Sequence, residues 1–389
     1  MIKGSILKKR LVGGGSLNLN RLNVKNLIAD KTIVISSEYN ELLVNNKYFP
    51  HMKFLPTNSI SDLTSLYIDY KFKDNSNNIV LSLWMERLQG IIDGAKCKKN
   101  LIKSIQILEA IYVPLGTSFC TSFAFHKSKT NKLGPVILKN YDIADIIRPF
   151  SFLRYCEPKN KFKNFDMALS VQPGAHTLIN EKGFCISFNF GVTLMDPKIG
   201  VLPTFIAQYG IENFSTTKEF VHWVSDVVAA QGCLFTVCDI NSNICVVEKI
   251  GAITSVRKAI DGATVATNHY VSNSLAPLNF DIKTTYSKSS PPCLRNVSVN
   301  KSNILRYNRG RKLITKFKSK KIDLEDIKTI AKDHNNKKEG SEESICRHHP
   351  ILGTAGSVIL QPKENKILVC NGKPCKEKYK EIDLNNYFK

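Results

Sequence analysis

Short apolar strands that come in adjacent pairs dominate the chain after residue 119. Residues 121–125 and 135–138 flank a polar turn that contains glycine, and residues 233–239 and 244–249 flank an Asn-Ser-Asn turn. Two such runs around a short polar turn are typical of a β-hairpin. Further strands are expected at residues 183–190, 263–267, 357–361 and 367–370. Because no regular helix separates consecutive strands, the sequence predicts antiparallel rather than doubly wound parallel sheets.

Apolar residues recur at helical spacing in three segments. Residues 85–111 show this spacing with a break near Gly94, and Pro114 and Gly116 follow as helix terminators. Residues 218–230 and 324–333 show it as well, and Asp323 is placed to cap the first turn of the last segment. Together with the hairpins, these segments predict an α+β fold in which two antiparallel sheets stack and the helices lie outside.

The chain is strongly basic, with 55 Lys and Arg against 33 Asp and Glu, a formal net charge of +22. Such an excess attracts anions in general, nucleic acid included. The lysines are spread along the whole chain beside abundant asparagine, so a nucleic-acid partner is not expected. The densest basic run, residues 309–321, is interpreted as the solvated face of a helix.

The chain carries eleven cysteines, no apolar run of about 18 residues and no secretory signal at its first residues. These features predict reduced thiols, no membrane span and a cytoplasmic location. Neither Cys238/Cys245 nor Cys370/Cys375 has the paired close spacing of a zinc ribbon, so no metal site is expected. Four histidines, at 269, 334, 348 and 349, are expected to make structural hydrogen bonds.

A cysteine near the start of one predicted strand begins the most informative motif. Cys120-Thr121-Ser122 opens an apolar run, and Lys139-Asn140-Tyr141-Asp142 follows it. This pattern resembles the start of the catalytic chain in the N-terminal-nucleophile (Ntn) cysteine hydrolases. Within them it is most similar to the acyl-coenzyme A:isopenicillin N acyltransferase family, with bile salt hydrolase, penicillin V acylase and acid ceramidase as wider relatives.

Further motifs follow in the order that this family has. They are the helix at residues 86–94, Asn180-Glu181-Lys182-Gly183, Phe188-Asn189-Phe190, Thr267-Asn268-His269-Tyr270, Asp333-His334, Ile345-Cys346-Arg347-His348 and Thr354-Ala355-Gly356-Ser357-Val358. The resemblance covers roughly residues 85–375, and residues 1–84 match no motif.

The resemblance implies a four-layer αββα sandwich and activation by self-cleavage between Phe119 and Cys120. Residues 1–119 would be a proregion that is cut but retained, and residues 120–389 the catalytic chain. Cleavage frees the α-amine of Cys120, whose usual pKa of about 7.7–8.0 lies close to the value of about 8.5 for a thiol. The amine can therefore act as the base for the thiol of the same residue.

The resemblance also assigns roles to other residues. Asp142 would hold the α-amine, and Lys139 stands where bile salt hydrolases carry an arginine beside the nucleophile. The oxyanion hole would combine the backbone N–H of Asn189 with the side-chain amide of Asn268. Arg306 lies near the place of a structural or catalytic arginine, a slot for which Asn303 is the alternative. Asn140 and His269, in the same motifs, are expected to support the site or to contact the substrate.

The residue before the nucleophile departs from the family. The acyltransferase carries glycine at this position, whereas this chain carries Phe119. Since the attacked carbonyl belongs to the backbone, the chemistry survives. A bulky side chain is nevertheless expected to slow self-cleavage or to make it conditional.

The expected reaction is attack on a linear amide or an acyl thioester through an acyl-cysteine intermediate, which water or an amine resolves. The substrate would be a small N-acyl or peptide-like molecule; no cofactor is expected, and acyl-coenzyme A is a candidate donor. One alternative is a fatty-acid amide hydrolase of the acid ceramidase or N-acylethanolamine type, which the missing signal peptide disfavours. The other is an inactive Ntn scaffold that binds anions or nucleic acid.

Overall fold

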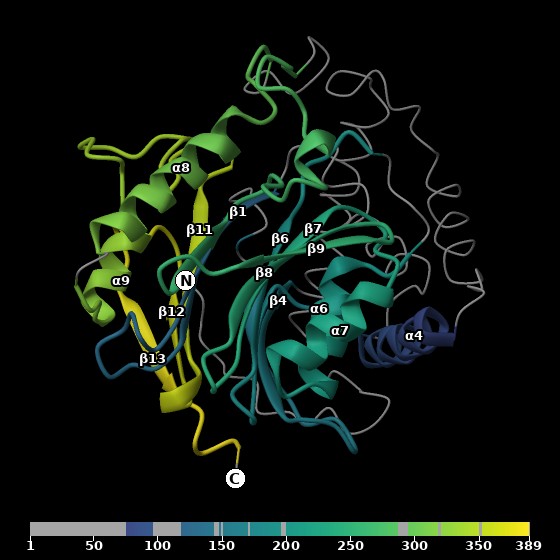
Figure 1. Ribbon diagram of the computed structural model, residues 1–389. Coiled ribbons are helices and arrows are strands. Elements are labelled where there is room, and N and C mark those ends of the chain that lie inside the picture. Colours follow the sequence, from purple (N-terminus) through teal and green to yellow (C-terminus); the bar gives the residue numbers. More distant parts are fainter. Residues whose placement is uncertain are drawn as a thin grey trace.

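The structure, a computed structural model, describes residues 75–95, 118–143, 148, 151–169, 172–195, 200–286, 295–317, 320–349 and 352–388. Two antiparallel sheets stack face to face, and helices cover both outer faces (Figure 1). The predicted α+β fold with an αββα order of layers is confirmed.

The sheet that contains Cys120 has six strands in the order β10-β1-β2-β11-β12-β13. Their bounds are Ser118–Phe125 for β1, Val136–Ile143 for β2, Ala263–Ala266 for β10, Thr354–Gln361 for β11, Lys366–Cys370 for β12 and Tyr379–Asp383 for β13. The hairpin of β1 and β2 places Cys120 opposite Tyr141 and Phe119 opposite Asp142. This register brings the two parts of the Cys120 motif together.

The second sheet has seven strands that run from β3 to β9 in sequence order. Their bounds are Ser151–Cys156 for β3, Asn164–Leu169 for β4, Thr177–Asn180 for β5, Cys185–Phe190 for β6, Cys233–Cys238 for β7, Ile244–Ile250 for β8 and Ile253–Lys258 for β9. Each strand is antiparallel to the next, so the sheet is a meander of hairpins.

Five α-helices form the outer layers within the described residues. On the seven-stranded sheet lie α4 (Asn75–Ala95), α6 (Pro203–Asn213) and α7 (Thr217–Asp226), and on the six-stranded sheet lie α8 (Lys301–Lys316) and α9 (Leu324–Ala331) (Figure 1). Two short 3₁₀ turns span Ala276–Leu278 and Pro362–Glu364. Both α7 and α9 begin with a capping box, the second at Asp323 as predicted.

Three apolar clusters hold the four layers together. One lies between α4, α6, α7 and the seven-stranded sheet, and a second lies between α8, α9 and the six-stranded sheet. The third joins the sheets to each other and includes Ala124 and Ile137 from one sheet and Phe165 and Ile179 from the other. Most strands in these clusters are therefore buried on both faces, because helices cover one face of each sheet and the other sheet covers the opposite face.

The predicted strands are present, and several are longer than their apolar runs, since polar residues of the site continue β2 beyond Leu138. The alternation of β6 is confirmed: Phe184, Ile186, Phe188 and Phe190 face the helices, and Cys185 faces the other sheet. The predicted end of the helix at residue 230 is wrong, because the backbone is extended from Val227 onward. Of the helix predicted over residues 85–111, the part after residue 95 lies outside the described residues.

Helix α4, upstream of Cys120, is an integral part of the outer layer. Val80, Trp84, Leu88 and Ile91 are buried in the same cluster as α6 and the seven-stranded sheet. Arg87 also forms an ion pair with Glu212 of α6, and both side chains are largely buried. None of the described helices is long and apolar enough to cross a membrane.

The packing predicts a large effect for one aromatic core residue. Phe235 is fully buried and its ring lies 5.7 Å from that of Phe220 and 5.8 Å from that of Phe188. Phe235→Ala is expected to lower the free energy of unfolding by about 3–5 kcal/mol through the cavity that it leaves. Ile253→Ala, at a side chain that is 44% exposed, is the control and should change it by less than about 0.5 kcal/mol. Urea unfolding of both variants measures the changes; equal effects would contradict the assigned core.

Candidate active site

The alternation of side chains along β1 gives Cys120 two different surroundings. Phe123 and Phe125 pack under α8 and α9, whereas Ala124 packs between the sheets. Successive side chains point to opposite faces of a strand, so Cys120 projects between the sheets and Phe119 projects toward the helices. The thiol and the peptide groups beside it therefore meet different residues.

On the face between the sheets, the thiol of Cys120 lies beside the ammonium of Lys139. Lys139 Nζ donates hydrogen bonds to the carbonyl oxygens of Phe188 and, at 3.4 Å, His176. Burial raises the pKa of the Cys120 thiol, and the positive charge of Lys139 opposes this rise. Burial likewise lowers the pKa of Lys139, and the thiolate raises it again. The charge of Lys139 thus offsets part of the cost of a buried thiolate.

Two aromatic side chains, those of Tyr141 and His176, lie beside the ammonium and contact each other. Tyr141, the register partner of Cys120, places its hydroxyl 3.4 Å from Nε2 of His176. Burial, followed by the charge of Lys139, lowers the pKa of His176 well below its usual range. A neutral imidazole results, so Lys139 carries the positive charge next to the sulfur.

On the helix side, the guanidinium of Arg306 holds the backbone of Cys120. Its Nη1 donates to the carbonyl oxygen of Cys120 at 2.7 Å and to Thr121 Oγ1 at 2.8 Å. Its Nη2 donates to Asn303 Oδ1 at 2.7 Å and to Asn268 Oδ1 at 3.1 Å. Arg306 comes from the middle of α8 and is fully buried. Of the two alternatives for this slot, Arg306 reaches Cys120 directly, and Asn303 contacts Arg306.

The nitrogen of Cys120 is held by a side-chain amide. It donates to Asn268 Oδ1 at 2.9 Å, while Asn268 Nδ2 donates to the carbonyl oxygen of Phe190 at 2.9 Å. Because Oδ1 faces two donors and Nδ2 faces an acceptor, these partners set the orientation of the amide. Nδ2 carries a second hydrogen, which is the donor that an oxyanion role requires.

Asp142 lies on the same side as Arg306, opposite Phe119 in the strand register. Its Oδ1 accepts a hydrogen bond from Thr354 Oγ1 at 2.7 Å, and its Oδ2 lies 3.9 Å from Arg306 Nη1. Oδ2 is buried and has no hydrogen-bond partner among the residues that the structure describes. Burial raises the pKa of Asp142 to about 6, although the charges of Arg306 and Arg347 oppose the rise. This carboxylate therefore has one acceptor oxygen in reserve.

Phe119 fills the space between two guanidinium groups. The Cζ atom of Arg347 lies 4.2 Å from the centre of its ring, and that of Arg306 lies 5.8 Å away. The ring also packs with Leu352 and Tyr286 and is only 3% exposed. In the intact chain, the residue before the nucleophile is thus locked in place by cation–π contacts.

The remaining expected residues have supporting positions. Asn189 accepts a hydrogen bond from Ser122 Oγ at 2.6 Å and donates to the carbonyl oxygens of residues 266 and 267. Phe188 N–H points to His176 on the β5 side, so the next N–H, that of Asn189, faces β7. Its role as an oxyanion donor stays a prediction.

Asn140 and His269 point away from the thiol. Asn140 donates to the carbonyl oxygens of Ala331 and Ile345 and accepts from Ser357 Oγ, which ties β2 to the helix layer. His269 Nδ1 bonds with Thr267 Oγ1 at 2.9 Å, and burial lowers the pKa of its imidazole to about 3. Both residues therefore stabilise the structure that surrounds the site.

Sequence reasoning missed three residues that the fold brings to this place: His176, Arg347 and Thr354. Arg347 and Thr354 stand within quoted motifs, and their hydrogen bond joins those motifs, since Arg347 N–H donates to Thr354 Oγ1 at 2.8 Å. The sequence signal that could have identified Arg347 and Thr354 was their position within the ordered series of family motifs. His176 stands in no quoted motif.

The raised pKa of Asp142 predicts a pH-dependent stability. Between pH 4 and pH 6 the folded chain holds a proton on Asp142 that the unfolded chain has released, so stability falls as the pH rises through this range. Relative to Asp142→Asn, the free energy of unfolding of the wild-type residue should decline by up to roughly 3 kcal/mol. Urea unfolding of both, each in the uncut Cys120→Ala background, measures the difference. Parallel pH profiles would show that this carboxyl has an ordinary pKa.

Three solved structures are similar to the chain at low identity: a variant of conjugated bile acid hydrolase from Clostridium perfringens, the N-acylethanolamine-hydrolyzing acid amidase (NAAA) ortholog of Caenorhabditis elegans, and penicillin V acylase from Agrobacterium tumefaciens. Their identities are 14%, 12% and 12% and their TM-scores 0.42, 0.42 and 0.39. They cover 69%, 63% and 68% of this chain and 93%, 93% and 86% of their own chains.

The sequence itself gives the stronger result. No curated protein matches the chain significantly. The profile of one family, described as acyl-coenzyme A:6-aminopenicillanic acid acyl-transferase, matches residues 129–375, which is more than half of the chain. The matched residues include Lys139, Asp142, Asn268 and Arg306. The chain therefore belongs to the acyl-coenzyme A:6-aminopenicillanic acid acyl-transferase family.

Proposed function

We propose that the chain cleaves itself between Phe119 and Cys120 and then acts as an N-terminal-cysteine amidohydrolase or acyltransferase. One observation carries the proposal: the sulfur and the nitrogen of Cys120 each have a separate, buried partner. The thiol lies beside Lys139, and the nitrogen donates to Asn268 Oδ1 at 2.9 Å. A residue that serves as both nucleophile and base needs this division.

Self-cleavage needs no residue beyond those at the site and water. The Cys120 thiol adds to the carbonyl carbon of Phe119, the C–N bond breaks, and the nitrogen takes up the thiol proton as it becomes an amine. Water then hydrolyses the thioester, which leaves a carboxylate on Phe119 and regenerates the thiol. Arg306 fixes the carbonyl oxygen of Cys120 during this rearrangement. The packed ring of Phe119 restricts the movement of the attacked carbonyl and so slows the step.

In the cleaved enzyme, the new amine takes the thiol proton, and the thiolate attacks the carbonyl of the substrate. The charge of Lys139 stabilises the thiolate, and the free oxygen of Asp142 is available to accept from the amine. The second N–H of Asn268 is the proposed donor to the oxyanion, and the N–H of Asn189 can join it only by turning from β7, which it faces in the intact chain. The amine then returns the proton to the leaving group, and an acyl-cysteine remains.

The proposed substrate is a linear amide or an acyl thioester. The acyl group is then transferred from the cysteine to water or to an amine. The family description supports the thioester, because acyl-coenzyme A is a thioester donor. The buried position of α4 supports a proregion of residues 1–119 that stays bound to residues 120–389 after the cut. Separation of the pieces would expose Trp84 and Leu88 together with the face of α6 that they cover.

The first test is the state of the purified chain. Wild-type protein is expected to yield a fragment that begins at Cys120, and Cys120→Ala is expected to stay intact, because the thiol is the attacking group. Phe119→Gly removes the packed ring and should cleave faster than the wild type. Intact mass and N-terminal sequencing over a time course measure all three. A wild-type chain that remains whole, together with a whole Phe119→Gly chain, would contradict self-cleavage.

The second test concerns Lys139 and the thiolate. Lys139→Met should raise the pKa of the Cys120 thiol, because a buried thiolate loses its positive neighbour, and each unit lowers the thiolate fraction at neutral pH about tenfold. Lys139→Arg keeps the charge and should retain most of the reactivity. The rate at which iodoacetamide labels Cys120, followed against pH, measures the shift.

Lys249→Met is the matched control for this test, since Lys249 is also a buried lysine near a cysteine, Cys233, but lies in β8. It should leave the labelling profile of Cys120 unchanged. An unchanged profile in Lys139→Met would remove Lys139 from the proposed mechanism.

A further inference from the structure

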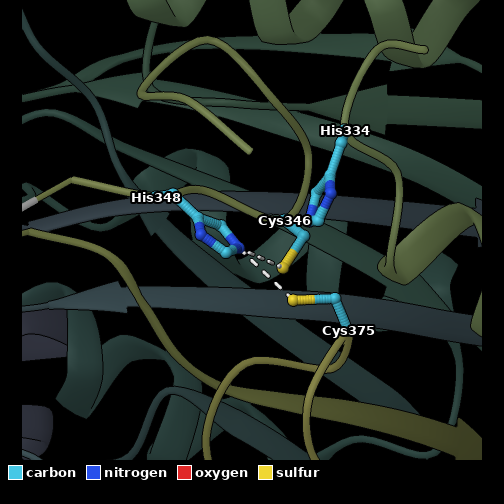
Figure 2. Close-up of side chains that lie close together, drawn as sticks. All are labelled: His334, Cys346, His348 and Cys375. Carbon is cyan, nitrogen blue, oxygen red and sulfur yellow. Dashed lines mark hydrogen bonds between the residues drawn. The ribbon is translucent and has the colours of Figure 1, made fainter. Parts of the chain in front are cut away.

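Four side chains outside the candidate active site converge on one point: His334, Cys346, His348 and Cys375. Figure 2 shows them directed toward one another; Cys346 and His348 lie on one segment, and His334 and Cys375 come from two others. Each offers one ligand atom, and these four atoms all lie within 4.8 Å of one another. Two nitrogens and two sulfurs are a ligand set typical of structural zinc sites.

The measured separations fit a tetrahedral ion. His348 Nε2 lies 3.3 Å from Cys375 Sγ and 3.7 Å from Cys346 Sγ. Zn–N bonds of about 2.0–2.1 Å and Zn–S bonds of about 2.3 Å place tetrahedral ligands roughly 3.3–3.8 Å apart. The widest pair thus needs an inward shift of only about 1 Å, which side-chain rotation provides.

One ring nitrogen of this cluster has no hydrogen-bond partner among the described residues. His334 Nε2 is buried and unpaired there, although its ring lies against that of His348, with centroids 4.8 Å apart. A buried ring nitrogen without a partner requires an explanation, because most buried polar atoms are paired. A metal ion at the point of convergence supplies the missing partner.

We propose that these four residues bind one Zn²⁺ ion in a closed, structural Cys₂His₂ site. Four protein ligands complete the tetrahedron, so no position remains for water or substrate. Two thiolates neutralise the ion, so Lys373 and Lys376, which lie near His348, do not oppose binding. The alternative is a disulfide between Cys346 and Cys375, but a disulfide does not explain why both imidazoles point to the same place.

The surrounding backbone holds the ligands in place. His334 follows the end of α9, and Cys346 N–H donates to the carbonyl oxygen of the adjacent Asp333 at 3.0 Å. Cys375 lies in the loop between β12 and β13. Gly340 packs against His348, where an added Cβ would lie 2.4 Å from the ring carbon Cδ2. The imidazole is therefore confined to the side that faces the sulfurs.

The zinc ion would also fix a loop that reaches the candidate active site. Arg347 lies between two of the ligands, and its guanidinium packs on the ring of Phe119. Its backbone N–H donates to Thr354, which in turn donates to Asp142. The ion would thus hold the loop that positions Arg347 and the support of Asp142.

Metal content of the full-length protein tests the proposal. Protein loaded with zinc, dialysed against metal-free buffer and measured by plasma mass spectrometry should hold about one zinc per chain. Cys375→Ala should reduce this content about tenfold, and Cys375→His, which restores a fourth ligand, should keep it. Cys375 is partly exposed in a loop, so its substitution leaves the core intact.

Matched controls are Cys245→Ala and His222→Ala, a cysteine and a histidine outside the cluster, and both should retain the zinc. Cobalt substitution gives a second readout, because Co²⁺ in this site should show tetrahedral and thiolate absorption bands that Cys375→Ala loses. The proposal fails if zinc is absent, if Cys375→Ala binds it as well as the wild type does, or if copper or iron occupies the site. It also fails if peptide mapping of anaerobically purified protein finds a disulfide between Cys346 and Cys375.

Discussion

The candidate site depends on the hydrogen bonds of the Arg306 guanidinium, which is buried between α8 and the six-stranded sheet. A charge without access to water is costly unless its donors are satisfied, and here oxygens from Cys120, Thr121, Asn268 and Asn303 accept from it. Burial lowers the pKa of Arg306 to about 10, which still leaves the group charged at neutral pH. The need to satisfy this one cation therefore fixes the backbone of Cys120 and the amide of Asn268, which holds the nitrogen of Cys120.

Strand geometry then gives the sulfur and the backbone of Cys120 different partners. The side chain lies between the sheets beside Lys139, whereas the backbone nitrogen and carbonyl oxygen meet Asn268 and Arg306. The four-layer fold supplies dry surroundings for both sets of partners, which strengthens each electrostatic contact.

Parts of the chain far from Cys120 in sequence stabilise this arrangement. Helix α4 covers the seven-stranded sheet, and the loop that carries Arg347 reaches the opposite side of the site. Arg347 connects the ring of Phe119 with Thr354, and Thr354 with Asp142. The cluster of two cysteines and two histidines borders the same loop, so the outer layer and the candidate active site share one support.

The sequence by itself determined the layers and the order of the motifs. Hairpin spacing and alternation predicted β1, β6, β7 and β8, because these patterns depend on local turns and on burial of a face. The burial of Arg306 and the roles of His176 and Thr354 could not be read in this way, since nothing local distinguishes a buried arginine of α8 from an exposed one. The metal-like cluster was missed for a related reason: only Cys346 and His348 are close in sequence, and tertiary structure alone brings His334 and Cys375 to them. Sheet register and loop packing decide which side chains lie close together, and both depend on contacts between residues that are distant in the sequence.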